Sequence, residues 1–421
     1  FQILDQGPVF IGLIAAIGLI LQKKKASVVL EGTIKTVVGL LIISLGAGIL
    51  MGTMGGIMGT LNDTIQVKGV LPVNEAAWAV AMKTMSNTIT LTFLVGFFIH
   101  LAMVWLIPWK IFKNVYLTAH MMLFLACFAD VTLEHIFHLS GTMLILTAGF
   151  MCALYWTLTP AIARKLGKDF LEDDLTLGFA SQVAAFFATR IAKVVGDPKD
   201  DAENLELPKY LAMFRDTTIS MSVLMPIMFI AIGLVVGGET IEGLSGGQNW
   251  FIYLVIQGLT FAAGIVILLS GVRLFISNIV AAFKGISNKL IPGAVPALDA
   301  PAVFPYSPTG AMIGFIGSLF GAFFALALMI VGSSPVIVFP SIIMMFFDGG
   351  VLGVFGNKYG GWKGAFMAGL VCNFFGHLGC AYIYPMLGPI YGSGLMFLNT
   401  DYFFIWTPVM FVLNLIAGNG F

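Results

Sequence analysis

Two stretches that lie 224 residues apart have nearly the same sequence, and they decide how the chain folds. The first is Gly69-Val70-Leu71-Pro72-Val73-Asn74-Glu75-Ala76, and the second is Gly293-Ala294-Val295-Pro296-Ala297-Leu298-Asp299-Ala300. Each places one carboxylate just after a hydrophobic stretch that glycine and proline interrupt. Paired interruptions in corresponding halves of an apolar chain are typical of the binding site of a secondary transporter. The sequence therefore predicts a duplicated membrane carrier.

Further matches between the two halves support this duplication. At the same offset, Leu117-Thr118-Ala119-His120-Met121-Met122 matches Ser341-Ile342-Ile343-Met344-Met345. With a slip of four residues, Gly149-Phe150-Met151-Cys152 matches Gly369-Leu370-Val371-Cys372. Each match is weak by itself because apolar helices resemble one another in composition. Their shared offset is the evidence for two repeats.

The composition is that of an integral membrane protein. Apolar residues make up 59% of the chain and charged residues only 10%, whereas soluble domains carry about 25% charged residues. The mean hydropathy is +0.98. The 49 glycines fit close helix packing, because small residues let helix backbones approach each other in lipid. The net charge of zero gives no sign of nucleic-acid binding.

The four cysteines predict no metal or redox chemistry. They stand in apolar runs without the spacing of metal ligands, so we expect small buried residues rather than disulfides or ligands. They are Cys127, Cys152, Cys372 and Cys380. No cofactor is predicted.

Apolar runs of roughly 17–25 residues can cross a bilayer as helices. Such runs lie near residues 8–22, 28–52, 88–108, 115–129, 141–163, 217–237, 250–275, 311–331, 364–383 and 402–418. Shorter pieces that glycine or proline interrupts lie near 53–82, 178–196, 284–306, 336–356 and 384–398. We therefore expect an all-α polytopic membrane protein with about eleven spans plus re-entrant hairpins. The first run lacks a cleavage site, which predicts a retained helix rather than a signal peptide.

Positive charge predicts the orientation of the spans, because cytoplasmic loops carry an excess of lysine and arginine. Lys23-Lys24-Lys25 follows the first apolar run. Six further cations lie in the polar stretches between the halves: Arg164, Lys165, Lys168, Lys199, Lys209 and Arg215. With both regions cytoplasmic, the amino terminus is outside and the repeats are inverted. The acidic stretch 197–216, which contains Pro198 and Pro208, is predicted to be a cytoplasmic linker.

The paired carboxylates each allow two interpretations. Asp299 lies between Pro296 and Pro301, where an ionisable group in a membrane is costly unless it faces a cavity or a partner. It is either a substrate contact or the N-cap of a short helix. Glu75, with Asn74 beside it, is its counterpart in the first repeat. Helix starts beyond both carboxylates would aim N–H groups at one cavity, which favours an anionic or hydroxyl-rich ligand.

Other polar residues in apolar runs are weaker candidates. His120 is either a substrate contact or a hydrogen-bonded packing residue. The segment 178–196 is either an amphipathic interfacial helix or the tip of a hairpin that enters the cavity, and in the second case Gln182 would contact the ligand. Four residues could be drawn as a metal cluster, although a polar loop between spans is the favoured interpretation: Asp130, Glu134, His135 and His138. No metal site is predicted.

Several motifs resemble a known family of permeases. These are Gly32-Thr33-Ile34-Lys35-Thr36-Val37-Val38-Gly39, the stretch from Phe283 to Ala294, the following Asp299, and Phe355-Gly356-Asn357-Lys358-Tyr359-Gly360-Gly361-Trp362. They are similar to the ascorbate-type membrane component, EIIC of the SgaT/UlaA family, of the bacterial phosphoenolpyruvate:sugar phosphotransferase system. The resemblance covers essentially the whole chain.

The resemblance implies a homodimer of protomers with about eleven spans in the bacterial cytoplasmic (inner) membrane. Each protomer would have a V-motif scaffold domain and a core domain that carries the sugar and moves like an elevator. In this sequence the scaffold would comprise residues 1–60 and 217–278, and the core 61–196 and 279–421. The linker 197–216 would join the halves.

The resemblance also implies a function. The family takes up L-ascorbate, and the cytoplasmic partner EIIB, itself supplied by EIIA, phosphorylates the sugar from a phosphocysteine. The membrane component carries no phosphorylated residue of its own and needs no cofactor. By similarity the ligand positions are Asn74, Glu75, His120 and Asp299, with the 178–182 segment and its Gln182 on another side.

This sequence differs from the best-known members within the implied site. Asn74-Glu75 stands where those carry Thr-Tyr, Phe124 where they carry Gln, and Phe179-Ala180 where they carry His-Gln. The ligand is therefore L-ascorbate first, with another sugar acid or a polyol as the alternative. An ion-coupled sugar symporter is the alternative mechanism, because the same carboxylates could bind a proton or sodium ion. A channel or receptor fits two facing broken helices less well.

Overall fold

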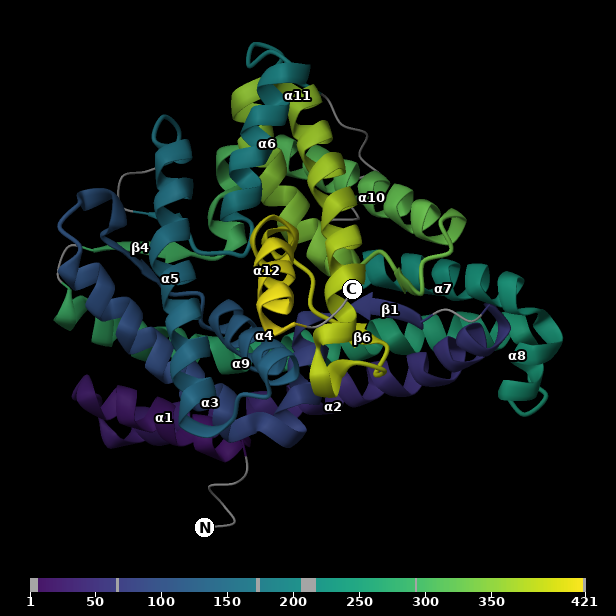
Figure 1. Ribbon diagram of the computed structural model, residues 1–421, viewed down its shortest axis with the longest axis horizontal. Helices are drawn as coiled ribbons and strands as arrows, with labels where there is room; N and C mark the ends of the chain where they lie inside the picture. Colours follow the sequence, from purple (N-terminus) through teal and green to yellow (C-terminus); the bar gives the residue numbers. More distant parts are fainter. Residues whose placement is uncertain (1–6, 66–67, 172–174, 206–216, 292–293, 419–421) are drawn as a thin grey trace.

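The molecule is built mainly from helices, with short strands between them (Figure 1). The structure is a computed structural model that describes residues 7–65, 68–171, 175–205, 217–291 and 294–418. Two groups of helices can be distinguished in Figure 1: one group runs across the lower part of the view, and the other lies above it or beside it.

The lower group contains the longest uninterrupted helices. Its members are α1 (Gly7–Leu21), α2 (Ala26–Ile65), α7 (Thr217–Val236), α8 (Gly238–Leu244) and α9 (Trp250–Leu290). The helix α2 packs along α9, and both α1 and α7 pack against this pair. Forty residues of helix extend about 60 Å, twice the thickness of the hydrocarbon layer, so α2 is longer than an upright membrane span requires.

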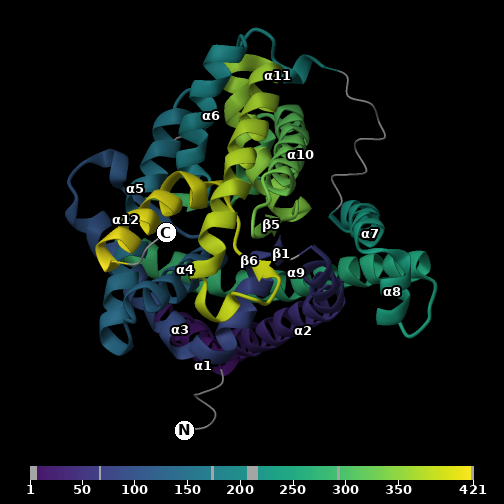
Figure 2. The same ribbon diagram turned by 45° about the vertical axis from the view of Figure 1, so that its right-hand side comes forward.

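The remaining helices lie above this group or beside it. They are α3 (Asn74–Leu106), α4 (Ala119–Phe137), α5 (Gly141–Gly167), α6 (Gln182–Val195), α10 (Pro308–Val331), α11 (Ile342–Ile383) and α12 (Thr407–Ala417), the last preceded by the π-helical turn η8 (Tyr402–Trp406). Of these, α5, α6 and α11 stand upright in Figure 1. Short 3-10 turns connect them: η1 (Lys110–Phe112), η2 (Ala202–Asn204), η4 (Ala300–Ala302), η5 (Phe304–Tyr306), η6 (Tyr384–Met386) and η7 (Gly388–Ile390). Figure 2 shows α10 and α11 standing side by side.

The helix α11 is bent where two glycines follow each other. Gly361 has a φ of +63°, which L side chains rarely adopt, and Gly360 is also outside the helical region. A Cβ on Gly361 would lie 2.4 Å from the carbonyl oxygen of Asp200. The bend therefore lets α11 turn back through the molecule while residues 197–200 pass close to it.

The interrupted segments form two small parallel sheets, which the expectation of an all-α protein did not include. One sheet has the order β5 (Val336–Val338), β1 (Lys68–Pro72), β6 (Leu395–Met396), and the other has the order β2 (Asn114–Tyr116), β4 (Val295–Leu298), β3 (Thr176–Leu177). Proline and glycine stop the helices here, and backbone groups away from water must still be hydrogen-bonded. Pairing between distant segments supplies those bonds.

The predicted polytopic class is confirmed, whereas the number of spans stays a prediction. Within the described residues, seven helices are long and apolar enough to cross a membrane, or eight if the bent pair Met221–Val236 and Gly238–Leu244 forms one span. The bent α11 counts once in this total although it consists of two straight parts. The cysteines are buried and free, as expected.

The first part of the stretch between the halves is packed against the upright helices. The side chain of Asn357 on α11 donates to Asp201 at 2.6 Å and accepts from the Ala202 N–H at 2.8 Å. Ala202 itself is fully buried. The rest of the predicted linker, 206–216, lies outside the described residues, and so do Pro208, Lys209, Arg215 and Gly293.

Candidate functional site

The structure brings His120 and Asp299 together, although 179 residues separate them in the chain. His120 is in the first turn of α4, just after β2, and Asp299 follows β4 directly. Because β2 and β4 are parallel neighbours, the chain leaves both strands at the same edge of the sheet. The His120 Nε2 atom lies 3.6 Å from Asp299 Oδ2. The histidine side chain is 13% exposed and the aspartate side chain 40%, so the carboxylate is accessible from one side.

Asp299 also has the structural role that the sequence left open. One carboxylate oxygen accepts the N–H of Ala300 at 2.8 Å and so caps η4. The other oxygen is the one that faces His120. The two interpretations of Asp299 are therefore compatible, because capping uses one oxygen and leaves the second available.

Glu75 lies in the first turn of α3, beyond β1, and is 6% exposed. Its Oε2 atom is buried and has no hydrogen-bond partner among the described residues. The Asp299 carboxylate is near enough to interact with Glu75 electrostatically. A buried carboxylate oxygen without a partner is costly, so this atom is suited to bind a donor group of a ligand.

Further buried polar atoms without a described partner lie at neighbouring helix starts. They are Trp78 Nε1 on α3, Thr118 Oγ1 and His120 Nδ1 at the start of α4, and Ser341 Oγ at the start of α11. The Trp78 ring lies 6.4 Å from that of Phe124, which lies 5.8 Å from that of His120. Donors and acceptors beside aromatic rings are the usual lining of a sugar site, which needs hydrogen bonds and flat apolar faces.

Two of the predicted ligand residues instead bind other parts of the protein. Asn74 is fully buried, donates to the Asn399 side chain at 2.7 Å and accepts the Leu398 N–H at 2.8 Å. Gln182 is also fully buried; its Oε1 accepts from the Tyr155 hydroxyl at 3.0 Å and its Nε2 donates to the Leu177 carbonyl at 3.3 Å. The other three predicted residues are available to a ligand. Glu75 Oε2 and His120 Nδ1 have no hydrogen-bond partner among the described residues, and the Asp299 carboxylate is accessible from one side.

A buried aspartate that is not among the residues predicted from the sequence lies at the centre of a polar network. Asp348, on α11, is fully buried and accepts from the Ser181 hydroxyl, from Asn399 Nδ2 at 2.9 Å, and from both the N–H and the hydroxyl of Thr400. This network ties α11 to the segments before α6 and before η8. An acid within an apolar run was the available signal, because such residues are rare in membrane spans unless they are paired.

Asp401 is a second buried aspartate that is not among the residues predicted from the sequence. It accepts from the Tyr155 hydroxyl at 2.6 Å, from the Ala184 N–H at 2.8 Å and from the Val183 N–H at 3.3 Å. Residue 401 thus provides the anion at the start of α6 although it is more than 200 residues away in sequence. Both aspartates hold the elements around the site and have their hydrogen bonds supplied by the protein.

The four residues that could have formed a metal cluster do not form one. No group of three or more histidine, cysteine, aspartate or glutamate side chains with suitable geometry occurs in the part of the chain that the structure describes. Asp130 is buried and accepts from Thr92 at 2.9 Å, whereas Glu134 and His135 are exposed near the end of α4. The favoured interpretation, a polar loop between spans, is wrong for Asp130, Glu134 and His135, which lie within α4, and only His138 follows the helix.

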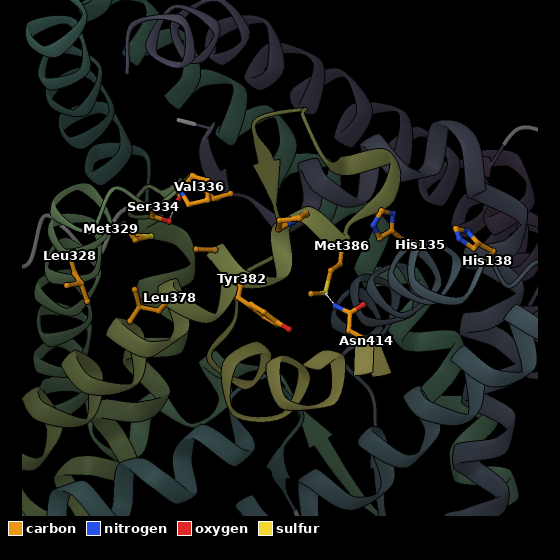
Figure 3. A pocket seen from close by; sticks show the side chains of 14 residues that line it. His135, His138, Leu328, Met329, Ser334, Val336, Leu378, Tyr382, Met386 and Asn414 are labelled. Carbon is orange, nitrogen blue, oxygen red and sulfur yellow. Dashed lines mark hydrogen bonds between the residues drawn. The ribbon is translucent and has the colours of Figure 1, made fainter. Parts of the chain in front are cut away.

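A cavity of about 880 Å³ shares no lining residue with the Glu75, His120 and Asp299 cluster. Figure 3 shows His135 and His138 at one side of this cavity and Leu328 and Met329 at the other. Its lining is mainly apolar. We therefore locate the candidate site by its polar chemistry rather than by cavity size.

The chain matches the model of the EIIC-GAT family, described as the PTS system sugar-specific permease component, over residues 2–401. The chain belongs to this family. As an EIIC permease it is a multi-pass protein of the inner membrane, which agrees with the apolar helices of the fold. The resemblance that the motifs suggested is thereby confirmed.

A curated relative of this EIIC permease is the "Ascorbate-specific PTS system EIIC component" of Mycoplasma pneumoniae (strain ATCC 29342 / M129 / Subtype 1). The two are 26% identical over 415 residues, which cover 86% of this chain. The chain spans 63% of the length of that relative.

Proposed function

We propose that this EIIC permease imports L-ascorbate, or another sugar acid or polyol of similar size, and that a cytoplasmic EIIB protein phosphorylates the sugar during transport. The single observation that carries the proposal is the cluster of Glu75, His120 and Asp299 at helix starts that two distant halves of the chain contribute. The relative of ascorbate type makes L-ascorbate the first candidate.

The chemistry of the cluster suits a hydroxyl-rich ligand. The Glu75 and Asp299 carboxylates can accept hydrogen bonds from sugar hydroxyls, and Trp78 Nε1 can donate one. The N–H groups at the starts of α3 and α4 favour partial negative charge on the ligand. Asn74 and Gln182, which were expected to contact the ligand, would act by holding the surrounding elements in place.

Asp299 is the residue best placed to assist phosphoryl transfer. In the proposed step the phosphocysteine of EIIB donates its phosphoryl group to a sugar hydroxyl oxygen, the S–P bond breaks, and the cysteine leaves as a thiolate. The hydroxyl proton passes to the Asp299 carboxylate, whose oxygen facing His120 is accessible. The permease would position the hydroxyl and take no phosphoryl group itself.

We also infer two inverted repeats from the way the sheets are built. In one sheet β1 lies between β5 and β6, and in the other β4 lies between β2 and β3. Each sheet therefore has a central strand from one half of the chain and two flanking strands from the other half. Exchange of this kind is expected when two equivalent halves face each other about a twofold axis.

The packing of the helices supports a scaffold and a core that move relative to each other. The helices α1, α2, α7 and α9 pack together and would form the V-motif scaffold, residues 1–60 and 217–278. The core would comprise 61–196 and 279–421. A cavity of about 220 Å³ with an almost wholly apolar lining separates α7 from α10. Such a contact is compatible with sliding, because it has few hydrogen bonds to break. A homodimer is proposed from the resemblance.

Transport assays test the proposed function. Labelled L-ascorbate uptake should be measured in membrane vesicles with and without the soluble EIIA and EIIB proteins and phosphoenolpyruvate. We expect accumulation of phosphorylated product only when all are present, and competition with unlabelled sugar acids and polyols would rank the ligands. Accumulation driven by a proton or sodium gradient alone would contradict the proposal and favour an ion-coupled symporter.

A further inference from the structure

A cavity of about 330 Å³ lies between α2 and α3, beside the candidate site. Its α3 side is formed by Trp78, Met82, Lys83 and Ser86, among others, and its α2 side includes Ser44. No acidic side chain is among its lining residues. The cavity is therefore a compartment with one cation and hydroxyl groups, between the proposed scaffold and core.

The cavity continues the face of α3 on which Glu75 lies. Counting from Glu75, the residues Trp78, Met82 and Ser86 are three, seven and eleven positions further along the helix. As far as Met82 this spacing places them on one side of an α-helix, whereas Ser86 follows a kink at Met85, whose φ of -121° and ψ of 20° are not helical. The same face thus leads from the candidate site at Glu75 to Met82 in the cavity, and Ser86 lines the cavity beyond the kink.

Lys83 supplies the charge of the cavity. It is exposed, and no hydrogen bond or ion pair of its side chain occurs among the described residues. Lys83 is the tenth residue of the long apolar helix α3. This position is unusual, because a lysine within a span normally faces a partner or a water-filled space. An ammonium group beside low-dielectric walls attracts anions more strongly than one in open water.

Trp78 belongs both to the lining of the cavity and to the aromatic group next to His120. Its side chain lines the cavity and is 4% exposed, and its ring lies 6.4 Å from Phe124 on the side of His120. The Trp78 Nε1 atom is buried without a described hydrogen-bond partner. It can therefore donate a hydrogen bond to a ligand that passes from the cavity to the site.

We propose that this cavity is an entry vestibule that binds an anionic sugar acid at Lys83 before the sugar moves past Trp78 to Glu75, His120 and Asp299. The inference rests on the proposed function, because it names the charge class of the transported sugar. A lipid phosphate could bind the same ammonium group, and the second experiment below distinguishes these two anions.

The first experiment measures the kinetics of L-ascorbate uptake in vesicles that contain the complete phosphotransferase system. Lys83→Gln should raise KM about three- to tenfold and leave kcat within about twofold, because one screened charge interaction is lost before the transport step. Lys83→Arg, which keeps the charge, should stay within about twofold of the wild-type KM. The control Lys24→Gln removes an exposed cation from the turn between α1 and α2 and should have no effect. An unchanged KM in Lys83→Gln, or an equal increase in Lys83→Arg, would overturn the proposal.

The second experiment needs no transport and so remains informative if the proposed coupling is wrong. Ser44→Cys is made in a background that lacks the four native cysteines, and the purified protein in lipid vesicles is treated with anionic and cationic thiol reagents. The anionic reagent should react several times faster than the cationic one, and this preference should disappear in Ser44→Cys with Lys83→Gln. L-ascorbate should protect the cysteine. Lack of any charge preference, or protection by added anionic lipid but not by L-ascorbate, would overturn the vestibule.

Discussion

Asp299 shows how one side chain can serve both the fold and the proposed site. Asp299 caps η4 with one oxygen and faces His120 with the other. Glu75 differs, because its Oε2 has no partner in the described residues. A ligand with several hydroxyl groups would satisfy these atoms together. The affinity for this ligand should therefore depend more on the negative charge of residue 299 than on its hydrogen bond to the start of η4.

Asp299→Asn tests this dependence. Asparagine keeps the volume and can still cap η4, but it removes the charge that a ligand hydroxyl would meet. Loss of a charged hydrogen bond in a buried site costs about 1.5–3 kcal/mol, so L-ascorbate affinity should fall about ten- to a hundredfold. Calorimetry on purified protein measures the affinity, with Glu239→Gln on the exposed α8 as the control. If the L-ascorbate affinity of Asp299→Asn stays within about threefold of the wild-type affinity, Asp299 acts only as the cap of η4.

At the scale of the elements, close contact between α10 and α11 depends on glycine. A Cβ on Gly314 would lie 2.2 Å from the Gly349 carbonyl oxygen and 2.4 Å from the Gly353 Cα. Both are backbone atoms, which cannot move away without shifting a helix. Because α11 also carries Asp348 and begins beside Ser341, its distance from α10 affects the polar network around the site.

Gly314→Ala should therefore destabilise the protein. Insertion of a methyl group into a filled helix contact typically costs about 1–3 kcal/mol. Gly48→Ala on α2 is the matched control, since a Cβ there meets no atom within 4 Å and alanine favours helix over glycine. Thermal unfolding in detergent should show a lower midpoint for Gly314→Ala and an equal or higher one for Gly48→Ala. Equal midpoints for both variants would mean that α10 and α11 can separate freely.

At the scale of the whole molecule, the connection between the two halves is partly fixed. Glu203 accepts hydrogen bonds from the Ser307 hydroxyl at 2.7 Å and from the N–H groups of Thr309 and Gly310, each at 3.0 Å. It thus caps α10 from a segment that was predicted to be a linker. The stretch 197–205 would therefore move with the proposed core, so that the connection to the scaffold begins only after it.

This cap should make stability depend on pH. Partial burial acts to raise the pKa of the Glu203 carboxyl, but the hydrogen bonds from Gly310, Ser307 and Thr309 outweigh it and lower the pKa. A lowered pKa in the folded state gives stability that is present above the unfolded pKa of about 4.3 and is lost as the pH falls through the folded value.

Glu203→Gln should accordingly lower the stability at pH 7 by about 1 kcal/mol or less, because solvent screens this exposed cap. The difference from wild type should shrink as the pH falls below about 4.3, where the wild-type carboxyl is protonated as well. Unfolding midpoints of the two proteins between pH 3 and pH 8 measure this, with Glu239→Gln as control. A difference in unfolding midpoint that stays constant over this pH range would mean that the charge of Glu203 does not contribute to capping α10.

The sequence by itself determined the membrane class, the family and the position of the interrupted segments. These follow from local properties: hydropathy reports where a helix can cross lipid, and proline with glycine reports where it must stop. The placement of Glu75 and Asp299 at one site could also be anticipated, because the repeated phrases put these equivalent carboxylates at equivalent helix starts, whereas the approach of His120 to Asp299 could not. Lys83 was visible as a cation in the sequence, but its cavity was not.

Only the tertiary structure decided which polar side chains bind the protein and which stay available. Asn74 and Gln182 are predicted ligand contacts, and the structure shows that each has a hydrogen-bond partner from a distant segment, Asn399 for the first and Tyr155 for the second. Asp348 and Asp401 were missed for the same reason, since their hydrogen-bond donors lie far away in the chain. Where water is excluded, a buried polar group must find its partner within the protein, and that choice depends on how helices pack in space. Apolar helices are too alike in sequence to specify that packing locally.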